Sequence, residues 1–390
     1  MTDSPYSRFQ QEELILRDEL AIDMPRLIAV MKDALLRELG DEIDLIIQYG
    51  SHLKGTAHPY SDLDLSYVPA HESTWKSITV VVAGVMCDLY PIHWSRLEEM
   101  ADFRDPSCTV LLDHRVLYQR NAGAAARLAA LPPRLLGLLQ PEARPAMLRW
   151  AQEIFRATGY DFFLLEQQAA AGHQWSCLQH ADRLLRRVLH GLAVCNQAVI
   201  DTRKLPEILA LPRLPVGFTE TVARITSSTD PGELLAACGT LMQTTRDLLL
   251  AEERQIPRQT TLPARLDSTY PELKADLQHV LLACERRDMF SLKSPVLSLY
   301  HELNLALAQA FTGTAYSDLN SLAEYEQDLV ALGFPALLPD MVSGDFAALH
   351  RACLAFDQHL QHFLREHTVQ LNAFDSIDAL QAYLDSRTPS

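Results

Sequence analysis

Two aspartates, Asp62 and Asp64, lie one residue apart in an apolar run, and ten residues separate Asp62 from a preceding Gly50-Ser51 pair. Alternate residues of a strand point to the same face, so we expect the two carboxylates to project side by side. Neighbouring carboxylates repel each other unless a cation lies between them, and Mg²⁺ binds one or two carboxylates together with substrate phosphates. Such a pair could bridge two Mg²⁺ ions about 3.5–4 Å apart, an arrangement that supports in-line displacement at phosphorus.

The Gly50-Ser51 pair fits a phosphate site beside these acids. Glycine lets backbone N–H groups approach a phosphate closely, and Ser51 can donate a further hydrogen bond or cap the next helix. Lys54 and Ser61, in the same connection, are candidates for further nucleotide contacts. The alternative is an ordinary turn in which aspartates end a strand. The fixed distance from Gly50-Ser51 and the flanking apolar strands favour the site.

The order Gly50-Ser51, ten residues, then Asp62-Leu-Asp64 resembles the signature of the DNA polymerase β-like nucleotidyltransferase superfamily. In pattern it is most similar to the aminoglycoside (antibiotic) nucleotidyltransferases and the small bacterial nucleotidyltransferases, over roughly residues 25–120. The resemblance implies a third acid on a later strand, and Asp88 lies in a β-branched run that could supply it. Asp88 would then join Asp62 and Asp64 as a metal ligand, or take the proton of the acceptor hydroxyl. An aspartate on an edge strand without such a role is the alternative.

Apolar periodicity predicts that a small mixed α/β unit positions these residues. Its expected elements are a helical segment at 8–39, a loop or helix at 51–60, a short helix near 94–104, and strands at 43–49, 62–68, 78–93 and 114–119. From about residue 143 onward strand signals almost vanish. Periodic segments there predict helices at 144–171, 174–200, 218–228, 231–255, 270–286, 292–312, 317–332, 345–366 and 376–386.

The expected fold class is therefore α+β: a small mixed-sheet nucleotidyltransferase domain followed by an all-α C-terminal region, a helical bundle. Composition and proline-rich connections divide the chain further. We expect a catalytic domain at 1–122, a linker with a short helix at 123–142, a helical substrate-binding domain at 143–257, and a second helical region at 258–390.

Two basic residues of the helical region are candidates for the nucleotide site. Arg187 lies on a stripe with other basic side chains along helix 174–200, and arginine forks match triphosphate oxygens well. A solvated helix face is the alternative interpretation. Lys204 follows that helix in a turn, a position that resembles the phosphate-contacting lysine of several bacterial nucleotidyltransferases. The aromatic residues that often surround that lysine are absent here.

Composition limits the partners. The 390 residues carry a formal net charge of −16, which disfavours nucleic-acid partners and favours a neutral or cationic acceptor. The seven cysteines are scattered without a Cys-x-x-Cys pair, as expected in a reduced cytoplasm. No signal peptide is visible and no apolar stretch approaches the ~18 residues that span a membrane, so we expect no membrane association.

These features predict a Mg²⁺-dependent nucleotidyltransferase. Two Mg²⁺ ions and ATP, or another nucleoside triphosphate, would be used to transfer AMP to a hydroxyl of a small acceptor such as an aminoglycoside-like sugar, with release of pyrophosphate. The alternatives are an adenylyltransferase that modifies a protein side chain, a nucleotide-binding sensor without turnover, and, disfavoured by charge, an enzyme that extends nucleic acid. The oligomeric state is open, with a homodimer as one option.

Overall fold

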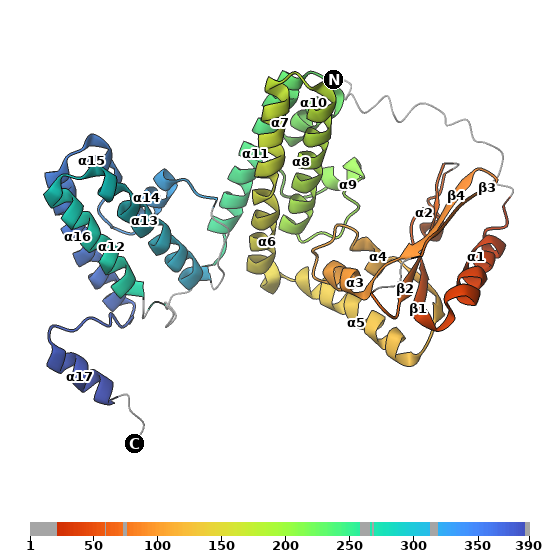
Figure 1. Ribbon diagram of the computed structural model, residues 1–390, viewed down its shortest axis with the longest axis horizontal. Coiled ribbons are helices and arrows are strands. Elements are labelled where there is room, and N and C mark those ends of the chain that lie inside the picture. The colour runs from red at the N-terminus through yellow and green to blue at the C-terminus, as the bar shows by residue number, and fades with distance from the viewer. Residues whose placement is uncertain are drawn as a thin grey trace. The chain divides into compact units, whose positions relative to one another are not determined.

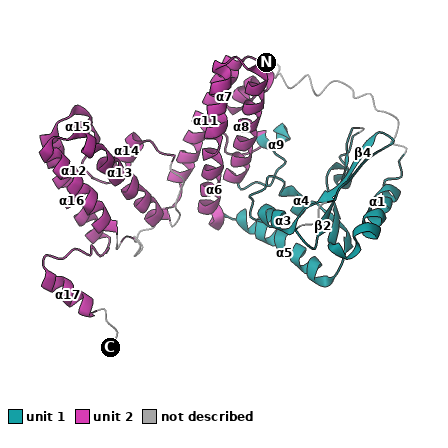
Figure 2. Cartoon of the chain, in the orientation of Figure 1, with its two compact units in different colours: residues 1–141, 197–208 teal, residues 142–196, 209–390 magenta. Residues whose placement is uncertain are grey.

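The computed structural model describes residues 22–58, 60–72, 76–257, 266, 269–312 and 319–386. The chain divides into two compact units. Unit 1 comprises residues 1–141 and 197–208, and unit 2 comprises residues 142–196 and 209–390 (Figure 2). The α+β class is confirmed, because a mixed sheet in the N-terminal part precedes a long series of helices (Figure 1).

Unit 1 is built on a five-stranded sheet with the order β3-β4-β2-β1-β5. The strands are β1 Ile43–Gln48, β2 Leu63–Pro69, β3 Ile78–Val82, β4 Val85–Pro91 and β5 Arg115–Gln119. Strand β2 pairs parallel with β4, and the other neighbours pair antiparallel. Because β2 and β4 are hydrogen bonded to each other, Asp64 on β2 lies beside Asp88 on β4, and Asp62 precedes β2 directly.

The expected single strand 78–93 is wrong, because this segment forms the two antiparallel strands β3 and β4. The chain reverses at Ala83 and Gly84, which both have positive φ values, 47° and 87°. Residues with this backbone conformation form the tight turns of two-residue hairpins. The apolar run on both sides of this short turn conceals it in the sequence.

Helix α1 (Met24–Leu39) covers one face of the sheet. Its N-cap Asp23 accepts a hydrogen bond from Arg26 N at 3.0 Å, and its apolar stripe packs on the sheet. The shared core contains Ile28, Met31, Leu35, Leu63, Leu65 and Tyr67. Residues 8–21 of the expected helical segment 8–39 lie outside the described residues.

Three helices lie on the other side of the sheet in Figure 1: α3 (Trp94–Ala101), α4 (Thr109–Leu112) and α5 (Ala122–Leu138). The Trp94 indole Nε1 donates to Asp44 Oδ2 of β1 at 2.8 Å. Helix α5 occupies most of the expected linker and is longer than the short helix expected there, although Pro132 and Pro133 lie inside it. Proline weakens a helix by removing a donor, but the buried leucines of α5 hold it against the unit.

Unit 2 is helical in all its described parts. The expected helix 144–171 is two helices, α6 (Arg144–Arg156) and α7 (Thr158–Ala170), which separate where the Thr158 hydroxyl donates to Phe155 O at 2.6 Å. The others are α8 Gln174–Cys195, α10 Phe218–Ser227, α11 Pro231–Arg254, α12 Thr269–Arg286, α13 Met289–Thr312, α14 Leu322–Ala331, α15 Leu338–Ser343, α16 Phe346–Glu366 and α17 Ile377–Ser386. No helix within the described ranges is long and apolar enough to cross a membrane.

The segment 197–208 belongs to unit 1 although residues of unit 2 precede and follow it. Gln197 Nε2 donates to Leu138 O at 2.9 Å and to Gln140 O at 2.8 Å, which ties the start of the segment to the end of α5. Helix α9 (Leu205–Leu209) begins within this segment. The sheet domain therefore receives a second, later piece of the chain.

Candidate active site

Gly50 packs closely against Asp64 in the site. Gly50 follows β1 with φ 80° and ψ −165°, and a Cβ atom added there would lie 1.9 Å from Asp64 Oδ2 and 2.7 Å from Asp64 Cγ. The neighbouring Tyr49 N donates to Asp64 O at 3.2 Å. Only glycine fits this position, so the backbone at Gly50 lies directly against the Asp64 carboxylate.

The acids gather on the face of the sheet opposite α1. Leu63 and Leu65 are buried in the core with α1, so the alternating residues Asp62 and Asp64 project from the other face. Asp88 is the Cα partner of Asp64 in the parallel pairing of β2 with β4, and its neighbours Cys87 and Leu89 also face α1. The structure thus places the three predicted acids on one face.

Thr79 of β3 holds one oxygen of Asp88. Its hydroxyl Oγ1 donates to Asp88 Oδ1 at 2.8 Å, and the two residues are Cα partners in the β3–β4 pairing. Thr79 is a site residue that sequence reasoning missed, because its role depends on a hairpin that was expected to be a single strand. The hydrogen bond fixes the orientation of the Asp88 carboxylate.

The carboxylates are coupled electrostatically. The pKa of Asp64 is raised from 3.8 to about 6, mainly by burial and then by the negative charges of Asp62 and Asp88, while the positive charge of Arg203 opposes the rise. Neighbouring carboxylates that resist ionisation together form an environment that favours a hard cation such as Mg²⁺. Within the described ranges, however, no group of three or more His, Cys, Asp or Glu side chains is arranged to hold a metal ion. The three-acid metal site therefore stays a prediction.

Arg203, the residue before the predicted Lys204, interacts electrostatically with the acids of unit 1. Its guanidinium forms a fork with Asp201, with Nε 2.9 Å from Oδ1 and Nη2 3.1 Å from Oδ2. This hydrogen bonding raises the pKa of Arg203, and the charges of Asp64 and Asp62 contribute to the rise. Lys204 is directed to Glu207, with Nζ 3.4 Å from Oε1. Contact of Lys204 with the nucleotide stays a prediction, and the folded turn adds Arg203 as a second candidate that the sequence did not single out.

The remaining predicted nucleotide contacts have partners of their own. Ser51 is the first residue of the short helix α2 (Ser51–Lys54). Ser61 is buried, and its hydroxyl accepts a hydrogen bond from His58 N at 2.9 Å, so it stabilises the connection. Lys54 Nζ lies 2.7 Å from Asp113 Oδ2, which neutralises its charge.

Arg187 belongs to unit 2. Its Nε lies 2.8 Å from Oδ2 of Asp161, a buried carboxylate on α7. Removing this arginine would leave the buried charge of Asp161 uncompensated. Arg187 therefore stabilises the packing of the helices in unit 2. A role of Arg187 in nucleotide binding stays a prediction.

Two tyrosines form a hydrogen-bonded network with the ends of the central strands. The hydroxyls of Tyr49 and Tyr90 are hydrogen bonded to each other, and Ser66 Oγ donates to the Tyr49 hydroxyl at 3.4 Å. Burial raises the pKa of Tyr49 above its usual range, and Tyr90 and Asp64 add to the rise. The neutral network connects β1, β2 and β4 where the acids lie. Tyrosine in an apolar strand is usually a core residue, so the sequence pattern did not indicate this network.

The raised pKa of Asp64 predicts that, in metal-free protein, the free energy of unfolding falls as pH rises from about 4 to about 6. In that range the unfolded chain has lost the proton of this carboxyl and the folded protein still holds it, so each rise in pH favours unfolding. Denaturant titrations in a chelator should show that Asp64→Asn gains stability relative to wild type across this range, with no further change at higher pH. A difference that does not vary with pH would contradict the coupling.

No family model matches the chain, and no curated protein is significantly similar to it. Among solved structures, the chain is similar to a nucleotidyltransferase-like protein from Exiguobacterium sibiricum 255-15, with 13% sequence identity and a TM-score of 0.33. The similarity covers 66% of this chain and 92% of that chain. A TM-score this low carries no argument about the present chain, so the function has to be inferred from the geometry of its own residues.

Proposed function

We propose that this chain is a Mg²⁺-dependent nucleotidyltransferase that transfers a nucleoside monophosphate from its triphosphate to a hydroxyl of a small acceptor. The observation that carries the proposal is the contact of the Gly50 backbone with the Asp64 carboxylate, on the face where Asp64 lies beside Asp88. A position that excludes even one methyl group brings the backbone directly beside clustered carboxylates. That combination suits a triphosphate and its cation.

The residues around this contact would share the work of binding the nucleotide. Asp62 and Asp64 would hold Mg²⁺, and the bound ion would neutralise negative charge on the phosphates. The backbone at Gly50 and Ser51 would donate to phosphate oxygens. Arg203, whose Nε and Nη2 atoms are held by Asp201, would donate from the remaining N–H groups of its guanidinium. Catalysis would then rest on positioning and charge stabilisation rather than on covalent chemistry by the protein.

The reaction forms a bond between the acceptor oxygen and the α-phosphorus. The bond from that phosphorus to the oxygen bridging the β-phosphate breaks, and pyrophosphate leaves with the electron pair. Asp88 would take the proton of the acceptor hydroxyl, with its Oδ1 held by Thr79. If Asp88 is this base, Asp88→Asn should lower kcat while the Kd of the nucleotide measured with Mg²⁺ stays unchanged. A weakened nucleotide affinity would instead assign Asp88 to the metal.

Charge and cysteine chemistry support the finer parts of the proposal. The net charge of −16 would attract a cationic acceptor such as an aminoglycoside-like sugar, with AMP from ATP as the transferred group. All seven cysteines are buried and unpaired, which supports a cytoplasmic location.

The test is pyrophosphate release from each ribonucleoside triphosphate with Mg²⁺, against a panel of aminoglycosides, lincosamides and simple sugars. Release that requires one acceptor and is absent in Asp62→Asn would establish the transferase and name its substrate. Asp62 is exposed, so this control should fold normally. Nucleotide binding without release on any acceptor would overturn the small-acceptor proposal in favour of a protein acceptor or a sensing role.

Arg203→Gln is expected to raise the KM for the nucleoside triphosphate about tenfold or more, because it removes a charge-assisted contact with phosphate. Lys204→Gln is the matched control, since it removes a neighbouring cation that pairs with Glu207. Steady-state kinetics of both variants measure the difference. Equal effects of the two substitutions would argue against a specific role of Arg203.

A further inference from the structure

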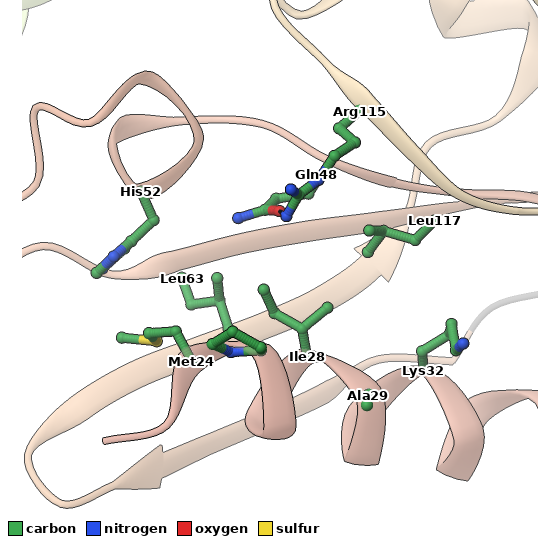
Figure 3. Close-up of a pocket in the computed structure, with 10 residues that line it drawn as sticks. Met24, Ile28, Ala29, Lys32, Gln48, His52, Leu63, Arg115 and Leu117 are labelled. Atoms are coloured by element: carbon green, nitrogen blue, oxygen red, sulfur yellow. Dashed lines mark hydrogen bonds between the residues drawn. The ribbon is translucent and has the colours of Figure 1, made fainter. Parts of the chain in front are cut away.

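A cavity of about 480 Å³ lies between α1 and the sheet (Figure 3). Leu63 lines it, so it opens on the face of β2 opposite Asp62 and Asp64. The wall from α1 is largely apolar and includes Met24, Ile28 and Ala29. The cavity is thus separate from the proposed nucleotide site and has a size typical of small-molecule pockets, about 300–1,000 Å³.

Among the residues that the structure describes, the polar part of the lining has positive charge and no carboxylate. Lys32, Gln48, His52 and Arg115 contribute it. Gln48 and Arg115 are Cα partners in the β1–β5 pairing, and Arg115 Nη2 donates to the neutral amide oxygen Gln48 Oε1. In the described part of the chain Arg115 forms no ion pair. Its positive charge is therefore available to an anion in the cavity.

His52 adds a second observation. Its Nε2 atom is buried and has no hydrogen-bond partner among the described residues. Figure 3 shows its ring reaching from α2 toward Met24, on the other side of the cavity from Arg115. A buried polar atom without a partner costs free energy, and a ligand or water in the cavity would remove that cost.

We infer that this cavity binds a small organic anion with an apolar body. The body would lie against Ile28 and Leu63, and its acidic group would pair with Arg115, which now has only a neutral partner. Lys32 adds positive charge to the lining. Its ion pair with Asp33, at 3.5 Å, is weak because the Asp33 side chain is largely exposed to solvent. His52 Nε2 offers a further hydrogen bond to a polar group of the ligand. This inference goes beyond the proposed function and does not depend on it.

The test compares 4-phenylbutyrate with its neutral amide, 4-phenylbutyramide, by titration calorimetry on the full chain. The carboxylate is expected to bind saturably and the amide about tenfold more weakly, since the amide cannot neutralise Arg115. Arg115→Gln should weaken carboxylate binding by about the same factor, with little effect on the amide. Ala29→Phe should reduce binding of both compounds by filling the cavity from an exposed position on α1.

Arg26→Gln is the matched control, because it removes an exposed arginine of the same helix that does not line the cavity. It should leave the affinity for 4-phenylbutyrate unchanged. Thermal unfolding of each variant verifies that it folds. The inference is overturned if the carboxylate does not bind at millimolar concentration, if acid and amide bind equally, or if Arg115→Gln and Arg26→Gln have the same effect.

Discussion

Asp64→Asn is expected to lower the rate of pyrophosphate release by about a hundredfold to a thousandfold while the protein stays folded. Asparagine has nearly the shape of aspartate, so the close contact with Gly50 can persist and only the negative charge is lost. Asp62 and Arg203 are the two charged groups that most affect the pKa of this carboxyl. Initial rates with saturating nucleotide and Mg²⁺ measure the loss.

Asp41→Asn is a suitable control for this experiment. Asp41 is an exposed acid of unit 1 in the short turn before β1, and it lies outside the candidate site. The control should retain the wild-type rate and the wild-type unfolding midpoint. A rate in Asp64→Asn equal to that of the control would remove Asp64 from the reaction, and with it the proposed site.

Gly50→Ala is expected to reduce activity about a hundredfold and to destabilise the fold by about 1–3 kcal/mol. The backbone at φ 80° and ψ −165° belongs to a region that only glycine adopts readily, and the new Cβ would displace the Asp64 carboxylate. A displacement of about 1 Å in a reacting group can cost this much rate. Pyrophosphate release and chemical denaturation measure the two effects.

Gly55→Ala separates backbone strain from displacement of the carboxylate. Gly55 also has a positive φ, 68°, but a Cβ added there would meet no atom within 4 Å. This variant should lose about 1 kcal/mol of stability and keep its activity. If both variants retain activity, the contact at Gly50 has no part in catalysis.

Local patterns predicted the parts of the molecule that depend on neighbours in sequence. The α+β class follows from strand periodicity that gives way to helical periodicity, and the common face of Asp62 and Asp64 follows from the period of a strand. The hairpin of β3 and β4 was not predicted, because β-branched residues continue on both sides of a two-residue turn. Helix α5 was expected to be mostly linker because the two prolines in its interior conceal its helical pattern.

Long-range partners account for the rest. Arg203 and Lys204 are equivalent in sequence, and only the folded turn directs one toward Asp201 and Asp64 and the other toward Glu207. Likewise, the pairing of Arg187 with the buried Asp161 within unit 2 depends on a partner that is distant in sequence. Sequence reasoning recognised which residue types could do the chemistry, but charge pairs between distant positions decide which of them remain available.

The return of residues 197–208 to the sheet domain limits how this protein can evolve by recombination. An exchange that joined a different helical domain after residue 141 would carry Asp62, Asp64 and Asp88 but would lose Arg203. The segment that must be exchanged as a whole therefore extends through residue 208 and includes the helices between residues 142 and 196. Replacement of the whole helical part would therefore also remove residues 197–208 from the sheet domain.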